Sequence, residues 1–188
     1  MAKKAQSTLP NMLVALTVIA LVAAAALAAL NSVTKAPIAK AQQAKVEQAI
    51  GAVLPKFASL DDQTIDNHLC HIGRDAEGQM VGVAIEAGND KGFGGHLQAM
   101  IGFNSDGSVY GYRILETHET PGLGAKAGEW FQKNGKGDII GSTPDASNPL
   151  IVKKDGGQID AISGSTITSR AFLNIVNEAS SVFSTLTK

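Results

Sequence analysis

The residues with the clearest chemical potential lie near the end of the chain, in the segment Asp160-Ala-Ile-Ser-Gly-Ser-Thr-Ile-Thr-Ser169. The segment is crowded with small hydroxyl residues and directly precedes an amphipathic helical pattern. Several backbone N–H groups therefore stay free at the start of the predicted helix, where the positive end of the helix dipole favours a phosphate group. An ordinary N-cap by Ser163, Ser165 or Thr166 is the alternative interpretation, but it does not account for the acidic residue that opens the segment.

A second segment of interest is the loop His118-Glu-Thr-Pro-Gly-Leu-Gly-Ala-Lys126, which has no alternating apolar pattern. Pro121 fixes a bend in it, while Gly122 and Gly124 allow the backbone to approach a ligand closely. A loop of this composition is either a binding loop or a simple connection between ordered elements. We favour a binding loop, because the proline makes it rigid and the two glycines free its backbone.

The first segment resembles the D-x-x-[ST]-G-[AS]-T motif of a family of FMN-binding domains. The G subunit of the Rnf electron-transport complex shares this domain with the C subunit of the sodium-pumping NADH:quinone reductase. Asp160, Ser163, Gly164 and Thr166 match the motif, and Ser165 stands where alanine is common. Two further segments are similar to the family's ETPGLG segment and to the glycine-rich segment before it: Glu119 to Gly124, and Gly92-Phe-Gly-Gly95. The short length of the chain fits the Rnf G subunit better than the larger C subunit of the quinone reductase.

The resemblance implies that Thr166 carries FMN through a phosphoester bond, which a dedicated flavin transferase forms from FAD. It implies a flavoprotein that relays electrons to other membrane and peripheral subunits, in a complex that couples ferredoxin and NAD electron transfer to ion translocation. The chain would be an enzyme only as part of that complex, with no catalytic acid–base pair and no metal site of its own. Lys126 is expected either to stabilise reduced, anionic flavin or to be a solvated charge. The expected cofactor-binding residues are Thr166, Asp160, Ser163, Gly164, Ser165, Glu119, Thr120, Gly122, Leu123, Gly124 and Lys126.

The elements that must position these residues are short strands followed by a helix. Runs rich in β-formers occur at Met80–Ala87, His96–Phe103 and Val109–Leu115, with a hairpin turn between the last two. Leu150–Lys153 and Gln158–Ile162 flank another turn. Strands followed by a closing helix indicate an α+β domain with a mainly antiparallel sheet. The amphipathic C-terminal helix is predicted from one apolar face, made of Phe172, Ile175, Val176, Ala179 and Phe183.

The N-terminal region contains one long apolar segment. The 19 residues from Met12 to Leu30 include Thr17 as their only polar member, and as a helix they would measure about 28 Å, close to the hydrocarbon thickness of a bilayer. We expect a retained transmembrane anchor, because the segment is longer than the apolar part of a typical signal peptide. Cleavage near Ala26-Leu27-Ala28 is the alternative.

The sequence predicts the orientation of this anchor less directly than it predicts the span. Two lysines precede the span and three follow it closely, so the positive-inside rule does not decide. A short N-terminal stub before a large globular region is typical of a signal anchor, which predicts a single-pass protein of the cytoplasmic membrane with most of the chain outside the cytoplasm. We expect an anchor at residues 1–34, a juxtamembrane helix at 35–56 and the FMN-binding domain at 57–188. The lysines in question are Lys3, Lys4, Lys35, Lys40 and Lys45.

Several other functions are disfavoured. A net charge of −1 argues against a nucleic-acid-binding protein, and a single cysteine, Cys70, excludes an internal disulfide. His68-Leu-Cys-His71 has neither zinc nor haem spacing and is interpreted as polar loop residues. A serine hydrolase is disfavoured because the sequence contains no G-x-S-x-G motif. A C-subunit-like flavoprotein of a quinone reductase, or a membrane-tethered scaffold without a cofactor, remain the alternatives.

Overall fold

The computed structural model describes residues 8–187, which divide into two compact units between Ala44 and Lys45. Helix α1 (Leu9–Val53) is the first element, and its last residues belong to the second unit. The sequence predicts a separate juxtamembrane helix after Pro37, but α1 continues through this proline, which removes a single backbone donor without ending the helix. The boundaries proposed at residues 34 and 56 stay a prediction.

The first unit contains residues 9–44 of α1, including its apolar segment. An 18-residue window of this helix has a mean hydropathy of 2.8, and none of it is buried within the structure. The helix is therefore long and apolar enough to cross a membrane. Lys3 and Lys4, on which the orientation argument partly depends, lie outside the described residues.

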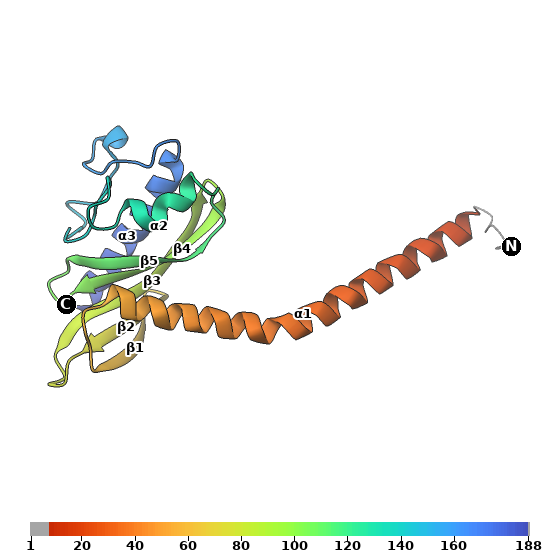
Figure 1. The fold of residues 1–188 in the computed structure, drawn as a ribbon, viewed down its shortest axis with the longest axis horizontal. Coiled ribbons are helices and arrows are strands. Elements are labelled where there is room, and N and C mark those ends of the chain that lie inside the picture. Colours follow the sequence, from red (N-terminus) through yellow and green to blue (C-terminus); the bar gives the residue numbers. More distant parts are fainter. Residues whose placement is uncertain (1–7, 188) are drawn as a thin grey trace. The chain divides into compact units, whose positions relative to one another are not determined.

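The second unit is built on an antiparallel sheet of five strands in the order β1-β2-β3-β4-β5 (Figure 1). Each strand pairs with the next along the chain, so the sheet is a meander. Helix α3 (Thr166–Leu186) follows it, which confirms the predicted α+β class. The strands are β1 (Ser59–Ile65), β2 (His68–Arg74), β3 (Met80–Gly92), β4 (Gly95–Asn104) and β5 (Val109–Thr117).

Two of these strands differ from what the sequence predicts. His68-Leu-Cys-His71 is not a loop, because it forms the first half of β2, where Cys70 and His71 are buried. Strand β1 is an edge strand whose residues are nearly all exposed, so its polar sequence has no alternating apolar pattern to reveal it. Leu150–Lys153 and Gln158–Ile162 differ as well, because they share only an isolated parallel bridge between Val152 and Ile159.

The sheet is covered on both faces. The predicted apolar face of α3 is buried and packs on side chains of β3 and β4, among them Val83 and Ile85 of β3. Because side chains alternate along a strand, Ala84 points to the opposite face, where it packs with Ile50 and Val53 at the end of α1. The end of α1 thus belongs to the second hydrophobic core of the domain.

A buried tyrosine joins the sheet to helix α2 (Ala127–Trp130). The hydroxyl of Tyr112 on β5 donates a hydrogen bond to the carbonyl of Ala127 at 2.6 Å and accepts one from the backbone N–H of Phe131 at 3.2 Å. Burial raises the pKa of Tyr112, so the phenol stays protonated and keeps both contacts. This pairing fixes α2 and the loop before it against the sheet.

A buried histidine lies among carboxylates on the face of the sheet that α1 covers. His71 is 4% exposed and contacts Glu86 through Nε2 at 3.5 Å and Asp62 through Nδ1 at 2.7 Å. Hydrogen bonds to Glu86 and Asp62 hold the pKa of His71 above its ordinary value, although burial opposes the shift. The imidazole therefore links three neighbouring strands.

Candidate functional site

Three parts of the domain meet at one pocket of about 350 Å³. They are the loop after β5, the hairpin between β3 and β4, and the first turn of α3. One residue of a fourth segment, Lys154 in the short 3₁₀ helix Lys153–Asp155, completes the lining. A pocket of this size suits a small-molecule ligand or part of a larger one. The structure therefore brings together segments that lie far apart in the sequence. The pocket is lined by Phe93, Glu119, Thr120, Leu123, Gly124, Lys154, Gly164, Ser165, Thr166 and Ile167.

The first turn of α3 begins at Thr166, with Ser165 in the N-cap position. The sequence allows a cap by Ser163, Ser165 or Thr166, but Ser165 makes no side-chain capping bond. Ser169 instead braces the turn, since its hydroxyl accepts from the Ile162 N–H at 2.9 Å and donates to the Ser165 carbonyl at 3.0 Å. The N-cap side chain thus leaves the first N–H groups of the helix available to a ligand.

The backbone and hydroxyl groups just before this turn are arranged around the pocket. Gly164 has a φ of +76°, a left-handed conformation that other residues adopt only with strain. Ser165 is 7% exposed, whereas Thr166 is more accessible and its hydroxyl receives a hydrogen bond from the ammonium of Lys154 at 3.3 Å. Of the two neighbouring hydroxyls, that of Thr166 is therefore the more open to chemistry.

The buried carboxylate of Glu119 holds the loop after β5 and the hairpin between β3 and β4 together. Glu119 is 7% exposed, and its Oε1 accepts a hydrogen bond from the N–H of Gly94 at the hairpin tip, at 3.2 Å. Gly124 packs so closely against it that a Cβ there would lie 2.2 Å from Glu119 Oε2 and 2.8 Å from Thr168 Oγ1. Within the described part of the chain, this Thr168 oxygen is the one buried side-chain polar atom without a hydrogen-bond partner.

The mouth of the pocket is apolar. Phe93 on the hairpin is 72% exposed, Leu123 on the loop is 45% exposed and Ile167 on α3 is 49% exposed. Exposed apolar side chains grouped around a pocket indicate a ligand or partner that covers them. A ligand with a flat apolar ring and an anionic tail fits this arrangement, because the ring can contact the apolar mouth and the anion can contact Lys154 and the helix N-terminus.

The structure places the remaining predicted residues outside the pocket lining. The carboxylate of Asp160 pairs with Lys153 at 2.7 Å, and its carbonyl accepts a hydrogen bond from the Trp130 side chain at 2.8 Å. Ser163 is exposed, and Lys126 is exposed at the end of a short 3₁₀ helix. Gly122, with a φ of +79°, shapes the loop instead of lining the pocket.

The pocket also contains residues that the sequence motifs do not select: Phe93, Lys154 and Ile167. Phe93 lies inside the glycine-rich segment Gly92–Gly95, and Ile167 directly follows Thr166. No sequence signal points to Lys154, because only the fold brings it next to Thr166.

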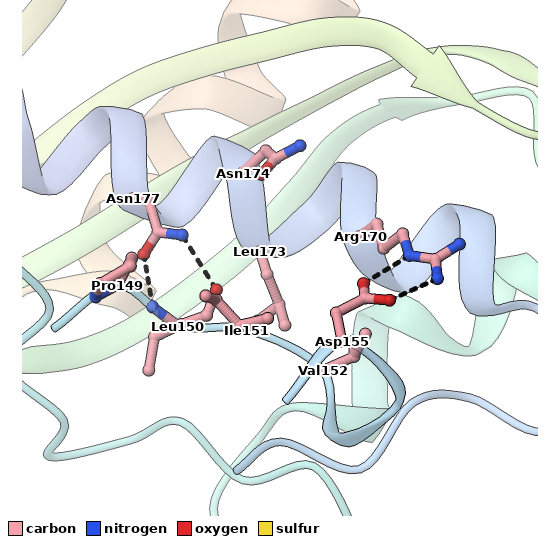
Figure 2. Close-up of a pocket in the computed structure, with 9 residues that line it drawn as sticks. All are labelled: Pro149, Leu150, Ile151, Val152, Asp155, Arg170, Leu173, Asn174 and Asn177. Atoms are coloured by element: carbon pink, nitrogen blue, oxygen red, sulfur yellow. Dashed lines mark hydrogen bonds and ion pairs between the residues drawn. The ribbon is translucent and has the colours of Figure 1, made fainter. Parts of the chain in front are cut away.

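Lys154 belongs to a segment that is fastened along α3 at two points (Figure 2). The amide of Asn177 accepts from the N–H of Leu150 at 2.8 Å and donates to its carbonyl at 2.9 Å. Arg170 donates two hydrogen bonds to the carboxylate of Asp155, both at 2.6 Å. Arg170 thereby lowers the pKa of Asp155, so this pair persists to a lower pH than an ordinary carboxylate would allow.

Comparisons with known proteins point to one family. A family model described as the FMN-binding domain matches residues 92–181, which include the hairpin, the loop and the first turn of α3. The G subunit of the ion-translocating oxidoreductase complex of Erwinia tasmaniensis is 32% identical over 92% of this chain and 89% of its own length. The corresponding protein of Escherichia coli O157:H7 is 30% identical over 88% and 86%, respectively. The G subunit of the Na⁺-translocating ferredoxin:NAD⁺ oxidoreductase complex of Acetobacterium woodii is 36% identical over 63% of this chain and 56% of its own.

Proposed function

Because the chain belongs to the family of G subunits of ion-translocating oxidoreductase complexes, we propose that it relays electrons through FMN joined covalently to Thr166. The complex would couple electron transfer between ferredoxin and NAD⁺ to ion movement, as the name of the Acetobacterium woodii relative states for that protein. The chain would act only as a subunit, with the apolar part of α1 as its membrane anchor.

One observation carries the proposed attachment. The hydroxyl of Thr166 lies in the pocket, at a helix N-terminus that the N-cap side chain does not occupy, and within hydrogen-bond distance of the Lys154 ammonium. A phosphodiester at this oxygen would place its negative charge beside a cation and the positive end of the helix dipole. A flavin transferase acting on FAD would supply the group.

The other pocket residues would hold and orient the flavin. The isoalloxazine ring supplies the electron-transfer chemistry when it is bound, and the protein supplies its placement and surroundings. Phe93, Leu123 and Ile167 would contact the ring and exclude water from part of its surface. Glu119 would keep the hairpin and the loop together through its bond to Gly94, so that these contacts hold a fixed geometry.

The proposed topology places most of the chain outside the cytoplasm. The chain would cross the membrane once, and its domain would face the other proteins of the complex from the outer side. A cysteine at an exposed position of the domain should then react with a membrane-impermeant maleimide in intact spheroplasts. Labelling that requires lysis would instead place the domain in the cytoplasm.

The attachment can be tested on the full-length chain purified from cells that also produce a flavin transferase. We expect a flavin-fluorescent band at the mass of the chain on a denaturing gel, and loss of that band in Thr166→Ala. Ser165→Ala is the matched control and should keep the fluorescence, because the buried neighbouring hydroxyl is not the proposed acceptor. A dark wild-type band would favour the scaffold alternative, and a fluorescent Thr166→Ala band would show that another residue is the acceptor.

A further inference from the structure

We propose that Lys154 neutralises the phosphate at Thr166, both while the flavin is being attached and afterwards, and that Arg170 positions Lys154 through Asp155. The inference rests on the proposed attachment of FMN to Thr166 and adds three residues that neither the sequence motif nor the family comparison assigns to it. The role expected for Lys126 concerned the reduced flavin and is a separate prediction, and Lys126 lies outside the pocket lining.

Three basic side chains lie near the Thr166 hydroxyl, and they differ in whether a carboxylate pairs with them. Lys153 contacts the Asp160 carboxylate at 2.7 Å, and Arg170 contacts the Asp155 carboxylate at 2.6 Å. Lys154 lies between these residues in the chain, yet no ion pair among the described residues includes it, and its ammonium contacts the Thr166 hydroxyl. Two of the three cations are thus neutralised by carboxylates, and the third points to the oxygen that would carry the phosphate.

Lys154 is held in place by contacts with α3 on either side of it. The segment from Leu150 to Asp155 has little regular structure of its own, apart from one short 3₁₀ helix at Lys153–Asp155. Asn177 fixes its beginning and Arg170 fixes its end, and both come from α3, the helix that Thr166 begins (Figure 2). The acceptor and the cation next to it are therefore anchored to the same rigid element, with Asp155 directly following Lys154.

The attachment chemistry explains why a cation is needed at this place. The Thr166 oxygen forms a bond to the FMN phosphorus of FAD, the P–O–P anhydride bond breaks, AMP leaves with the bridging oxygen, and the threonine proton is released to the medium. Negative charge increases on the phosphoryl oxygens during the transfer, and a positioned ammonium stabilises it. The product is a phosphodiester with one negative charge, which the single positive charge of Lys154 balances.

The direct test measures the rate of flavin attachment to the full-length protein, with purified flavin transferase, FAD and Mg²⁺. Lys154→Met should lower the apparent kcat/KM for attachment about tenfold, the lower end of the range for a charge-assisted hydrogen bond because Lys154 is exposed. Lys154→Arg should recover most of the rate. Lys133→Met removes one charge from an exposed lysine outside the pocket and should change the rate less than about twofold.

Two further readouts separate electrostatics and positioning from a general loss of structure. High salt should slow the wild type and leave Lys154→Met almost unchanged, since screening removes an interaction that the variant already lacks. Arg170→Met should lower the rate about threefold alone, and should cause no additional loss when combined with Lys154→Met. If Arg170→Met does not fold, Asp155→Asn provides the same test.

The possible failures can be told apart. A wild-type chain that acquires no flavin, or acquires it on another residue, would overturn the proposed function and this inference with it. Flavin attachment at Thr166 that is equally fast in Lys154→Met at low salt would overturn the role of Lys154 alone. An additive loss in the Arg170→Met and Lys154→Met double variant would show that Arg170 does not act through Lys154.

Discussion

Replacing Gly124 with alanine should disrupt the packing that joins the three parts of the pocket. The new Cβ would lie 2.2 Å from Glu119 Oε2 and 2.8 Å from both Glu119 Cδ and Thr168 Oγ1. Real Cβ atoms essentially never come closer than 3.0 Å to such atoms, so a neighbour must move. Neither neighbour is free to do so, because Glu119 is held by the Gly94 N–H and Thr168 is fully buried in α3.

The cost of this substitution follows from these contacts. Overpacking by one methyl group in a well-packed region costs about 1–3 kcal/mol. If Glu119 gives way, the hydrogen bond from Gly94 to its carboxylate is weakened, and bonds to charged groups contribute about 1.5–3 kcal/mol. We therefore expect Gly124→Ala to lower the free energy of unfolding by about 2–4 kcal/mol, which corresponds to roughly 5–15 °C in Tm for a domain of this size.

The measurement is urea unfolding of the full-length protein in detergent, followed by the fluorescence of Trp130. This residue is the only tryptophan of the chain and lies in α2, next to the loop. Gly128→Ala is the matched control, because no atom lies within 4 Å of its added Cβ. It should leave the stability unchanged or raise it by up to about 1 kcal/mol, as alanine favours a helix. Equal stabilities of the two variants, within about 0.5 kcal/mol, would refute the close packing around Glu119.

Three further predictions concern the core, the buried histidine and the mouth of the pocket. Tyr112→Phe should lower the free energy of unfolding by about 1–3 kcal/mol, because it removes the two buried hydrogen bonds of the hydroxyl. Tyr110, which is 42% exposed, is the control: Tyr110→Phe should change the free energy of unfolding by less than about 0.5 kcal/mol in the same urea titration, and equal losses in the two variants would contradict the assignment. The raised pKa of His71 means that this residue contributes stability in full below its unfolded-state pKa of about 6.5, and that the contribution is lost as the pH rises through its folded-state pKa. His71→Gln should remove this contribution in urea titrations at several pH values, and identical pH dependences of the wild type and the variant would count against it. Phe93→Ala should change the stability by less than about 0.5 kcal/mol but increase quenching of the flavin fluorescence by iodide, and unchanged quenching would place Phe93 away from the ring.

The fold was predictable wherever burial leaves a regular pattern in the sequence. Strands β3 to β5 and helix α3 bury one face or one stripe, and apolar residues recur there at the period of a strand or a helix. Strand β1 was missed because an edge strand exposed to solvent needs no apolar face. Strand β2 was hidden for another reason: its histidines are polar residues whose burial depends on carboxylates from other elements, such as Asp62 and Glu86 for His71.

The candidate site was predictable only where neighbours in space are also neighbours in sequence. The loop around Gly124 and the turn around Thr166 each form a local motif, so their residues could be selected before the fold was known. Lys154 could not be selected, because its proximity to Thr166 depends on two clamps between a loop and α3. The role of Ser169 could not be selected either, because this residue braces the turn from inside the helix.

The identity of the modified oxygen is tested most directly by fragmentation mass spectrometry of the tryptic peptide from Asp155 to Arg170. This peptide contains Thr166 together with Ser163, Ser165, Thr168 and Ser169, so a single spectrum distinguishes all the hydroxyl groups in question. We expect every fragment that retains Thr166 to carry the mass of FMN joined by a phosphoester, and no fragment that lacks Thr166 to carry it. An unmodified peptide from cells that produce the transferase, or FMN localised to one of the other hydroxyls, would contradict this prediction.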